Sequence, residues 1–264
     1  MITTIIMVIT ALAVHEAAHV LAANYLGGKV SHVRPFLLGF SAKINGLEKL
    51  RAWERYVIYF AGAAANFIVA AWAFTVHHLS YVGVDWLNQL ALYSLVLGIF
   101  NLIPALPLDG GRVFQQFLGN IIGVLRANRV ILWFGRFFAI FLGVLGVVQI
   151  ILYSYNITLL CAAIYIWHKN KKINPELQLE FFNAMEGKYI QDRARKMPIK
   201  QVSLPDSTSV SKALSRLTLD HYMVFDIKKE HIHENALLKY VFDNGLHGTL
   251  DDVLEPAANN GSAE

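Results

Sequence analysis

The segment HEAAH places His15, Glu16 and His19 at the spacing of a zinc-binding helix. Two histidines four residues apart project from one face of a helix and can bind one metal ion. Glu16 lies next to that face, where it can take a proton from water that the metal activates. Zinc suits this set because it binds imidazole nitrogens, has no redox chemistry and acts as a Lewis acid. The pattern therefore predicts a catalytic zinc site with Glu16 as its base.

The surroundings of HEAAH favour a metal site over a hydrogen-bonded polar cluster, which is the alternative. The segment lies inside an apolar stretch that is long enough to cross a membrane. An ionisable group deep in a bilayer costs about 2.5–3.5 kcal/mol on insertion scales. Two histidines and a glutamate so close together are expected at that depth only where they serve a function.

A third ligand is required, because catalytic zinc sites use three protein ligands and leave one position open. Asp109, in the motif NLIPALPLDGGR, is the candidate. Pro104 and Pro107 interrupt a helix, and Gly110 and Gly111 allow the backbone to turn sharply. Broken helix at membrane depth is tolerated where it lines a cavity. Asp109 could also cap the helix that DGG begins, instead of or besides binding metal.

Two asparagines within apolar segments, Asn66 and Asn101, are weaker candidates. Their amides could hydrogen-bond a substrate or an oxyanion, or could join neighbouring helices. Gly62, in the stretch AGAAAN, belongs to a small-residue surface that allows close helix packing.

The segment GGKVSHVRPFLLGFSAKI follows the HEAAH helix and contains alternating, strand-forming residues. It predicts a hairpin or a re-entrant loop near the site, and the alternative is a plain connecting loop. An exposed strand edge there could add a substrate segment as a further strand. A peptide bond held in that way would be extended for attack.

The elements that must position these residues are five predicted membrane spans. A spanning helix needs about 20 mostly apolar residues. Loops rich in Lys and Arg alternate with loops that have none, as the positive-inside rule requires. The N-terminus is therefore expected outside and the C-terminal tail in the cytoplasm, with HEAAH and Asp109 at a similar depth near the cytoplasmic face. The predicted spans cover residues 1–26, 56–79, 86–106, 130–153 and, in a shorter form, 156–167.

The composition divides the chain into an apolar part and a polar tail. Charged residues make up 16% of the 264 residues, below the roughly one quarter of soluble domains. The fold class expected is an α-helical multi-span membrane protein with a small C-terminal α/β cytosolic domain. The predicted divisions are a membrane domain (1–168), a linker helix (169–195), the α/β domain (196–256) and a disordered tail (257–264).

The charge and cysteine content exclude other classes. The net charge is +4 and the isoelectric point is about 9.1. In a membrane protein such an excess belongs to cytoplasmic loops, so no nucleic acid partner is expected. Cys161 is the only cysteine and lies in an apolar run, which excludes a disulfide framework and a cysteine zinc site.

HExxH in one transmembrane helix, a G-x-x-x-N stretch in a central span and a later N-x-x-P-x-x-P-L-D-G-G resemble the site-2 protease family of intramembrane zinc metalloproteases. The resemblance covers about residues 1–167. It implies that His15, His19 and Asp109 bind zinc, and that Glu16 activates water. It also implies a protein substrate, held in part by Asn101, and contact with membrane lipid. Family members usually carry a span before the HExxH helix, so either the start is truncated or this is a five-span member.

The tail resembles a CBS domain, a nucleotide-sensing module, and no PDZ-like insertion separates the two motifs. That arrangement resembles the sporulation branch of the family, which removes the pro-sequence of the sigma factor pro-sigma-K. It implies ATP as a ligand of the CBS-like domain and a location in the membrane around the forespore. CBS units work in pairs and this chain has one, which implies a homo-oligomer. Inhibitory membrane proteins are further partners of this kind of enzyme. The alternative is a CBS-gated membrane transporter of a metal or solute.

Overall fold

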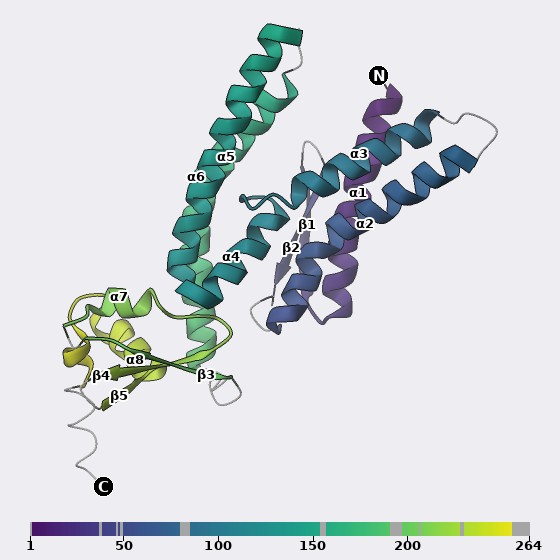
Figure 1. The fold of residues 1–264 in the computed structure, drawn as a ribbon. Coiled ribbons are helices and arrows are strands. Elements are labelled where there is room, and N and C mark those ends of the chain that lie inside the picture. Colours follow the sequence, from purple (N-terminus) through teal and green to yellow (C-terminus); the bar gives the residue numbers. More distant parts are fainter. Residues whose placement is uncertain are drawn as a thin grey trace. The chain divides into compact units, whose positions relative to one another are not determined.

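The computed structural model is mostly helical, and its chain forms two compact units, Met1–Phe114 and Gln115–Glu264 (Figure 1). It describes residues 2–36, 39–45, 47, 50–79, 85–153, 157–190, 197–205, 207–227 and 230–254. The predicted domain boundaries at residues 168, 195 and 256 stay a prediction.

The first unit is built on three helices that pack against one another (Figure 1). They are α1 (Ile2–Tyr25), α2 (Ala52–Leu79) and α3 (Asp85–Asn101). Small side chains at the contacts let the helix backbones approach closely, as in membrane helix bundles. The buried cluster that joins the three helices contains Ala11, Ala73, Leu87, Leu90 and Ala91.

Three helices in the described part of the chain are long and apolar enough to cross a membrane. These are α1, α2 and the segment Val124–Leu152 of α5 (Val124–Tyr153), and they agree with three of the five predicted spans. The predicted span at 86–106 falls on α3, which has 17 residues. The predicted span at 156–167 falls on the first part of α6 (Thr158–Ile190). The count of five spans stays a prediction.

A hairpin connects α1 to α2. Strands β1 (Lys29–Phe36) and β2 (Gly39–Asn45) pair antiparallel, with Lys29 opposite Asn45 and Phe36 opposite Gly39. The prediction of a hairpin is confirmed, and the plain connecting loop is excluded for these residues. Because the sheet has two strands, each strand has one edge without a partner in that sheet.

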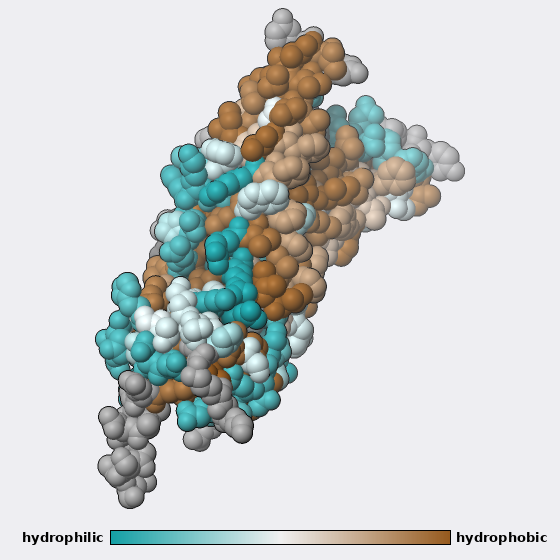
Figure 2. Space-filling model, turned by 60° about the vertical axis from the view of Figure 1, so that its left-hand side comes forward, coloured by the Kyte–Doolittle hydropathy of each residue, from teal (hydrophilic) through white to brown (hydrophobic). Residues whose placement is uncertain are grey.

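The long helices α5 and α6 form a hairpin in the second unit (Figure 1). Asn170 on α6 donates from Nδ2 to the Leu132 carbonyl of α5 at 2.9 Å. Helix α6 contains Pro175 and continues to Ile190, so the described parts of the predicted fifth span and of the predicted linker helix are one continuous helix; residues 191–195 of that linker lie outside the described residues. Figure 2 shows hydrophobic side chains over the end of this hairpin that carries the connecting segment, and hydrophilic ones over the C-terminal domain.

The C-terminal domain is a three-stranded sheet with two helices, in the order β3, α7, β4, β5, α8. Strand β4 (Tyr222–Ile227) is central, parallel to β3 (Ile199–Ser203) and antiparallel to β5 (Glu230–His233). The helices are α7 (Val210–Leu214) and α8 (Glu234–Asn244).

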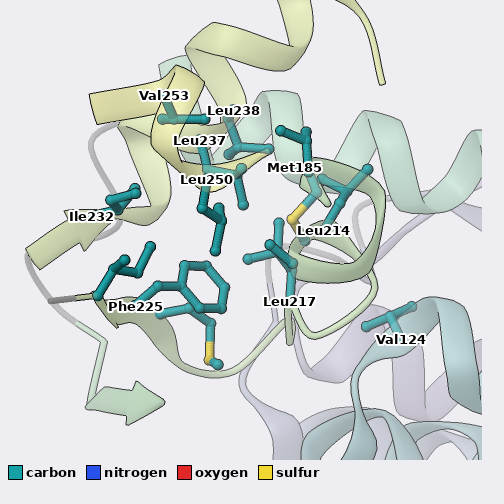
Figure 3. Packing of buried hydrophobic residues seen from close by; sticks show 14 of the residues in the cluster. Val124, Met185, Leu214, Leu217, Phe225, Ile232, Leu237, Leu238, Leu250 and Val253 are labelled. Carbon is teal, nitrogen blue, oxygen red and sulfur yellow. The ribbon is translucent and has the colours of Figure 1, made fainter. Parts of the chain in front are cut away.

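The core of this domain includes side chains from the two long helices (Figure 3). Val124 comes from the first residue of α5, and Phe181 and Met185 come from α6. They pack with Phe225 of β4 and Leu237 of α8. The sheet and its two helices therefore share one hydrophobic core with the ends of α5 and α6.

A buried ion pair joins the end of α6 to this domain. Lys188 donates from Nζ to Glu234 Oε1 at 2.6 Å and to the carbonyls of Thr218 and His221, each at 3.0 Å. The Met223 N–H donates to Glu234 Oε2 at 2.9 Å. Every ammonium proton therefore has an acceptor. Glu234 is fully buried, and this burial raises the pKa of its carboxyl group although Lys188 lowers it in part.

Replacing Lys188→Met leaves the Glu234 carboxylate buried without its cation, which is expected to cost about 3–5 kcal/mol of domain stability. The folded variant then holds a proton on Glu234 at a pH where the unfolded chain, with an ordinary pKa of about 4.3, has released it. Stability therefore falls as the pH rises above that value, and the loss is larger at about pH 7 than at about pH 5. Hydrogen exchange of the β4 and α8 amides in the full chain measures it.

The exposed Lys212→Met is the matched control, since its side chain lies on the surface of α7. The double change K188M/E234Q removes both charges and is expected to restore most of the protection. Equal exchange in the Lys188 and Lys212 variants contradicts the role of the ion pair.

Candidate metal centre

His15, His19 and Asp109 meet in the first unit. The Nε2 atoms of the two histidines lie 3.2 Å apart, and each is close to Asp109 Oδ2, at 2.9 Å from His15 and 3.1 Å from His19. All three donor atoms lie within 4.8 Å of one another. His15 is only 2% exposed, whereas the Asp109 side chain is 22% exposed, so the site is buried on the histidine side and partly open at the carboxylate. Residues separated by about ninety positions in the sequence thus present two nitrogens and one oxygen to a common point.

The imidazole of His19 is oriented by the backbone of α2. Its Nδ1–H donates to the Ile58 carbonyl at 2.7 Å. With the proton held on Nδ1, the lone pair of Nε2 points toward Asp109 and can bind a metal. Ile58 therefore fixes the tautomer that a metal ligand needs.

Asn66 has the same relation to His15. Its amide lies 3.1 Å from His15 Nδ1 through the atom assigned as Nδ2, while Asn66 Oδ1 is buried and has no hydrogen-bond partner in the described part of the chain. The two ends of an amide are assigned from the hydrogen-bond network, and turning this one over places Oδ1 against Nδ1–H. That orientation satisfies the orphaned oxygen and leaves the lone pair of His15 Nε2 free.

Gly62 leaves the space that the two imidazoles occupy. A Cβ atom at this position would lie 2.7 Å from His15 Nε2 and in closer overlap with His19 Nε2. Gly62 and Asn66 are one helical turn apart on α2, so they address the histidines from the same helix face. The packing of α2 on α1 therefore depends on glycine at this position.

Asp109 is the first residue of α4 (Asp109–Ile122), directly after the proline-containing segment. A Cβ atom on Gly110 would overlap the backbone of Leu102, and one on Gly111 would lie 2.6 Å from the backbone of Ala105. Two glycines thus let the segment between α3 and α4 fold closely against the start of α4, which positions the Asp109 carboxylate.

Of the two remaining predicted residues, Glu16 lies beside the three candidate ligands and Asn101 makes no hydrogen bond to them among the described residues. Glu16 is half-buried on α1 and interacts electrostatically with His15, His19 and Asp109. Asn101 lies at the end of α3, where its Nδ2 donates to the Leu97 carbonyl of the same helix at 3.0 Å. It makes no contact with the donor atoms among the described hydrogen bonds.

The donor set fits zinc. Two neutral imidazoles and one carboxylate are the ligands that catalytic zinc sites use, and three of them leave one position open. Each histidine has a second hydrogen-bonding partner at Nδ1, as ligating histidines almost always do. The site also includes Ile58 and Asn66, which orient the two imidazoles, and Gly62, which leaves room for them.

Known proteins that resemble this chain in sequence or in structure include metalloproteases and a site-2 protease. Residues 81–145, which include Asp109, match the family model of peptidase family M50. The Site-2 Protease from Methanocaldococcus jannaschii has a similar structure, with a TM-score of 0.53 and 25% identity over 63% of this chain and 75% of that one. The chain is therefore similar in sequence to peptidase family M50 and in structure to a site-2 protease.

Curated relatives are zinc metalloproteases. The zinc metalloprotease MJ0392 of M. jannaschii is 27% identical over 95% of this chain and 70% of its own length. The putative zinc metalloprotease sll0528 of Synechocystis sp. is 32% identical over 56% of this chain, and the putative zinc metalloprotease Rip3 of Mycobacterium tuberculosis is 32% identical over 48%. The chain spans 41% of sll0528 and 35% of Rip3.

Gly62→Ala is expected to weaken zinc binding about tenfold or more, because the added methyl group displaces both Nε2 atoms. Zinc per chain, and competition with a chelator of known affinity, measure the effect on purified protein. Gly143→Ala is the matched control, since a Cβ atom there meets Ala163 at an ordinary 3.8 Å. Full zinc affinity in the Gly62 variant contradicts this geometry.

Asn66→Ala is expected to lower zinc affinity by about 10–100-fold, since it removes the group that orients His15. Asn66→Asp keeps an oxygen that accepts the Nδ1 proton and is expected to retain most of the affinity. Asn101→Ala, which loses a bond only to its own helix, serves as control. If the alanine variant at Asn66 binds zinc as the wild type does, the orienting role is wrong.

Proposed function

We propose that this chain is an intramembrane zinc metalloprotease that cleaves a peptide bond in or near the membrane. The observation that carries the proposal is the meeting of two histidines and Asp109 beside a glutamate on a helix long enough to cross a membrane. The M50 relatives support the same activity. His15, His19 and Asp109 are the proposed zinc ligands.

The chemistry assigned to the chain itself centres on Glu16. Zinc held by the three ligands would act as a Lewis acid that polarises the scissile carbonyl. Glu16 takes a proton from the attacking water and then passes it to the leaving amine. Its half-buried position next to His15 is suited to that transfer. Asn66 orients His15 in this scheme, and Asn101 is a weaker candidate for holding the substrate.

The β1–β2 hairpin is the proposed site of substrate entry. A strand edge without a partner offers backbone N–H and C=O groups to an extended peptide. A substrate segment added there would be unwound, and only an unwound segment exposes its peptide bond to attack. The hairpin follows the HEAAH helix directly, which supports this assignment.

The proposed membrane arrangement has five spans and a cytoplasmic C-terminal domain. It rests on the alternation of basic and neutral loops. Cleavage would then occur near the cytoplasmic face, and the product would be released into the cytosol.

We propose that the chain belongs to the sporulation branch, because its arrangement resembles that of stage-IV sporulation protein FB. The proposed substrate is a protein like pro-sigma-K. The assignment to this branch rests on the order of the motifs and on the small α/β domain after the last long helix. In this proposal the domain is CBS-like, binds ATP and pairs with a second copy. The protein then resides in the membrane around the forespore under the control of inhibitory membrane proteins.

A CBS-gated transporter is the alternative, and two observations disfavour it. A transport site uses the histidines but assigns no role to Glu16 beside them. The relatives found by sequence are metalloproteases.

Glu16→Gln is expected to lower the cleavage rate by at least about a hundredfold, because it removes the general base while the ligand set stays intact. The test coexpresses the full chain with a pro-sigma-K-like substrate and with membrane-anchored substrates of other sequence, and follows cleavage by mass. Zinc content is expected to match that of the wild type.

Two controls separate the alternatives. His15→Ala and His19→Ala are expected to lose both zinc and cleavage. Wild-type cleavage by the Glu16 variant contradicts the assignment of the base. Metal flux into vesicles that depends on the histidines, without cleavage of any substrate, would support the transporter.

A further inference from the structure

A cavity of about 130 Å³ lies within the second unit, at the junction of α4, α5 and the C-terminal domain. It is well above the roughly 15 Å³ that a single water requires. Its lining comes from the end of α4, the first turn of α5, strands β3 and β4, and the segment after α7. The lining residues are Ile121, Ile122, Arg126, Lys200, Val202, Arg216 and Met223.

Three of these side chains are cations, and none of the described lining residues is acidic. Arg126 donates from Nε to Ser215 Oγ at 3.1 Å, and Lys200 donates from Nζ to the Asn120 carbonyl at 3.1 Å. Arg216 Nε is buried without a hydrogen-bond partner in the described part of the chain. Among the described residues, the acceptors in these hydrogen bonds are thus neutral oxygens, and Arg216 Nε has none.

Such a cluster is unfavourable unless an anion joins it. Like charges that share one cavity repel one another, and apolar walls such as Ile122, Val202 and Met223 strengthen that repulsion by lowering the local polarity. A buried guanidinium N–H without an acceptor adds to the cost. An anion in the cavity would relieve both.

The walls of the cavity are tied together. The Val124 N–H donates to the Leu217 carbonyl at 3.0 Å, and Asn120 donates from Nδ2 to Asp220 Oδ2 at 2.7 Å. Gly123, with a φ of 93°, lies against the Ser215 carbonyl, where a Cβ atom would overlap the backbone. The connection between α4 and α5 is therefore held on the domain.

We propose that this cavity binds a phosphoryl group. Arginine guanidinium groups match the tetrahedral oxygens of phosphate, and two arginines with a lysine supply the charge that a phosphate monoester or diester requires. Arg126 lies in the first turn of α5, at the start of the candidate membrane span Val124–Leu152. Basic pockets at the ends of spans bind lipid headgroups. The phosphoryl group therefore comes from a phospholipid headgroup or from a soluble phosphate compound, and the site is independent of the proposed protease activity.

The test uses the purified full chain and two probes. Inorganic phosphate is titrated calorimetrically at constant ionic strength, with chloride as the competing anion. Nanodiscs of phosphatidylglycerol are compared with nanodiscs of phosphatidylcholine by the melting temperature of the chain. Wild type is expected to bind phosphate above the chloride background, or to melt at higher temperature in phosphatidylglycerol. The first result identifies a soluble ligand and the second a lipid.

The variant R126Q/R216Q is expected to weaken that binding about tenfold or more, because it removes charge-assisted hydrogen bonds. Lys200→Gln, on the edge strand β3, is a milder change with the same expected direction. Arg129→Gln is the matched control, since Arg129 is exposed on α5 and does not line the cavity. Wild type that responds to neither probe overturns the proposal. The proposal is also overturned if Arg129→Gln weakens binding as much as R126Q/R216Q does. It is likewise overturned if neither Lys200→Gln nor R126Q/R216Q weakens binding.

Discussion

The close approach of two imidazoles and one carboxylate in a buried position is the constraint on which the first unit depends. Polar groups buried in apolar surroundings must be paired, and an unpaired one costs several times what a surface contact contributes. With the imidazole protons on Nδ1, the Nε2 atoms of His15 and His19 and the Oδ2 atom of Asp109 present three acceptors to one another, and a bound cation would satisfy all three. The packing of α2 on α1 and the fold of the segment before α4 follow from this constraint.

Local pattern accounts for much of the first unit. The HEAAH spacing, the glycine pair after Asp109 and the alternation of the hairpin residues each depend on neighbours in sequence, and each predicted feature is found in the structure. The Ile58 carbonyl is different. A backbone carbonyl carries no sequence signal, and its contact with His19 depends on how two distant helices pack. Gly62 was visible as part of a small-residue surface, but only the structure identifies the imidazoles that it accommodates.

The C-terminal half shows where local pattern fails. The predicted fifth span (156–167) and linker helix (169–195) were separate elements, yet the described part of both belongs to α6, which continues through Pro175. Proline removes one backbone donor, and tertiary contacts outweigh that loss here. The sharing of Val124, Phe181 and Met185 with the core of the small domain was not predictable either, since Val124 lies between two predicted spans and the other two lie in the predicted linker helix. Their apolar character alone does not say what these side chains pack against. Identifying the core of the small domain as their partner therefore requires three-dimensional contacts.

Helix α4 belongs to both units, because it begins at Asp109 in one and ends at Ile122 in the other. This helix has 14 residues and is about 21 Å long. Coupling between two sites is reciprocal. If folding of the C-terminal domain changes the free energy of metal binding at Asp109, then metal binding changes the stability of that domain by the same amount. Metal occupancy would then report on the folding of the C-terminal domain, and the melting of that domain would report on the metal.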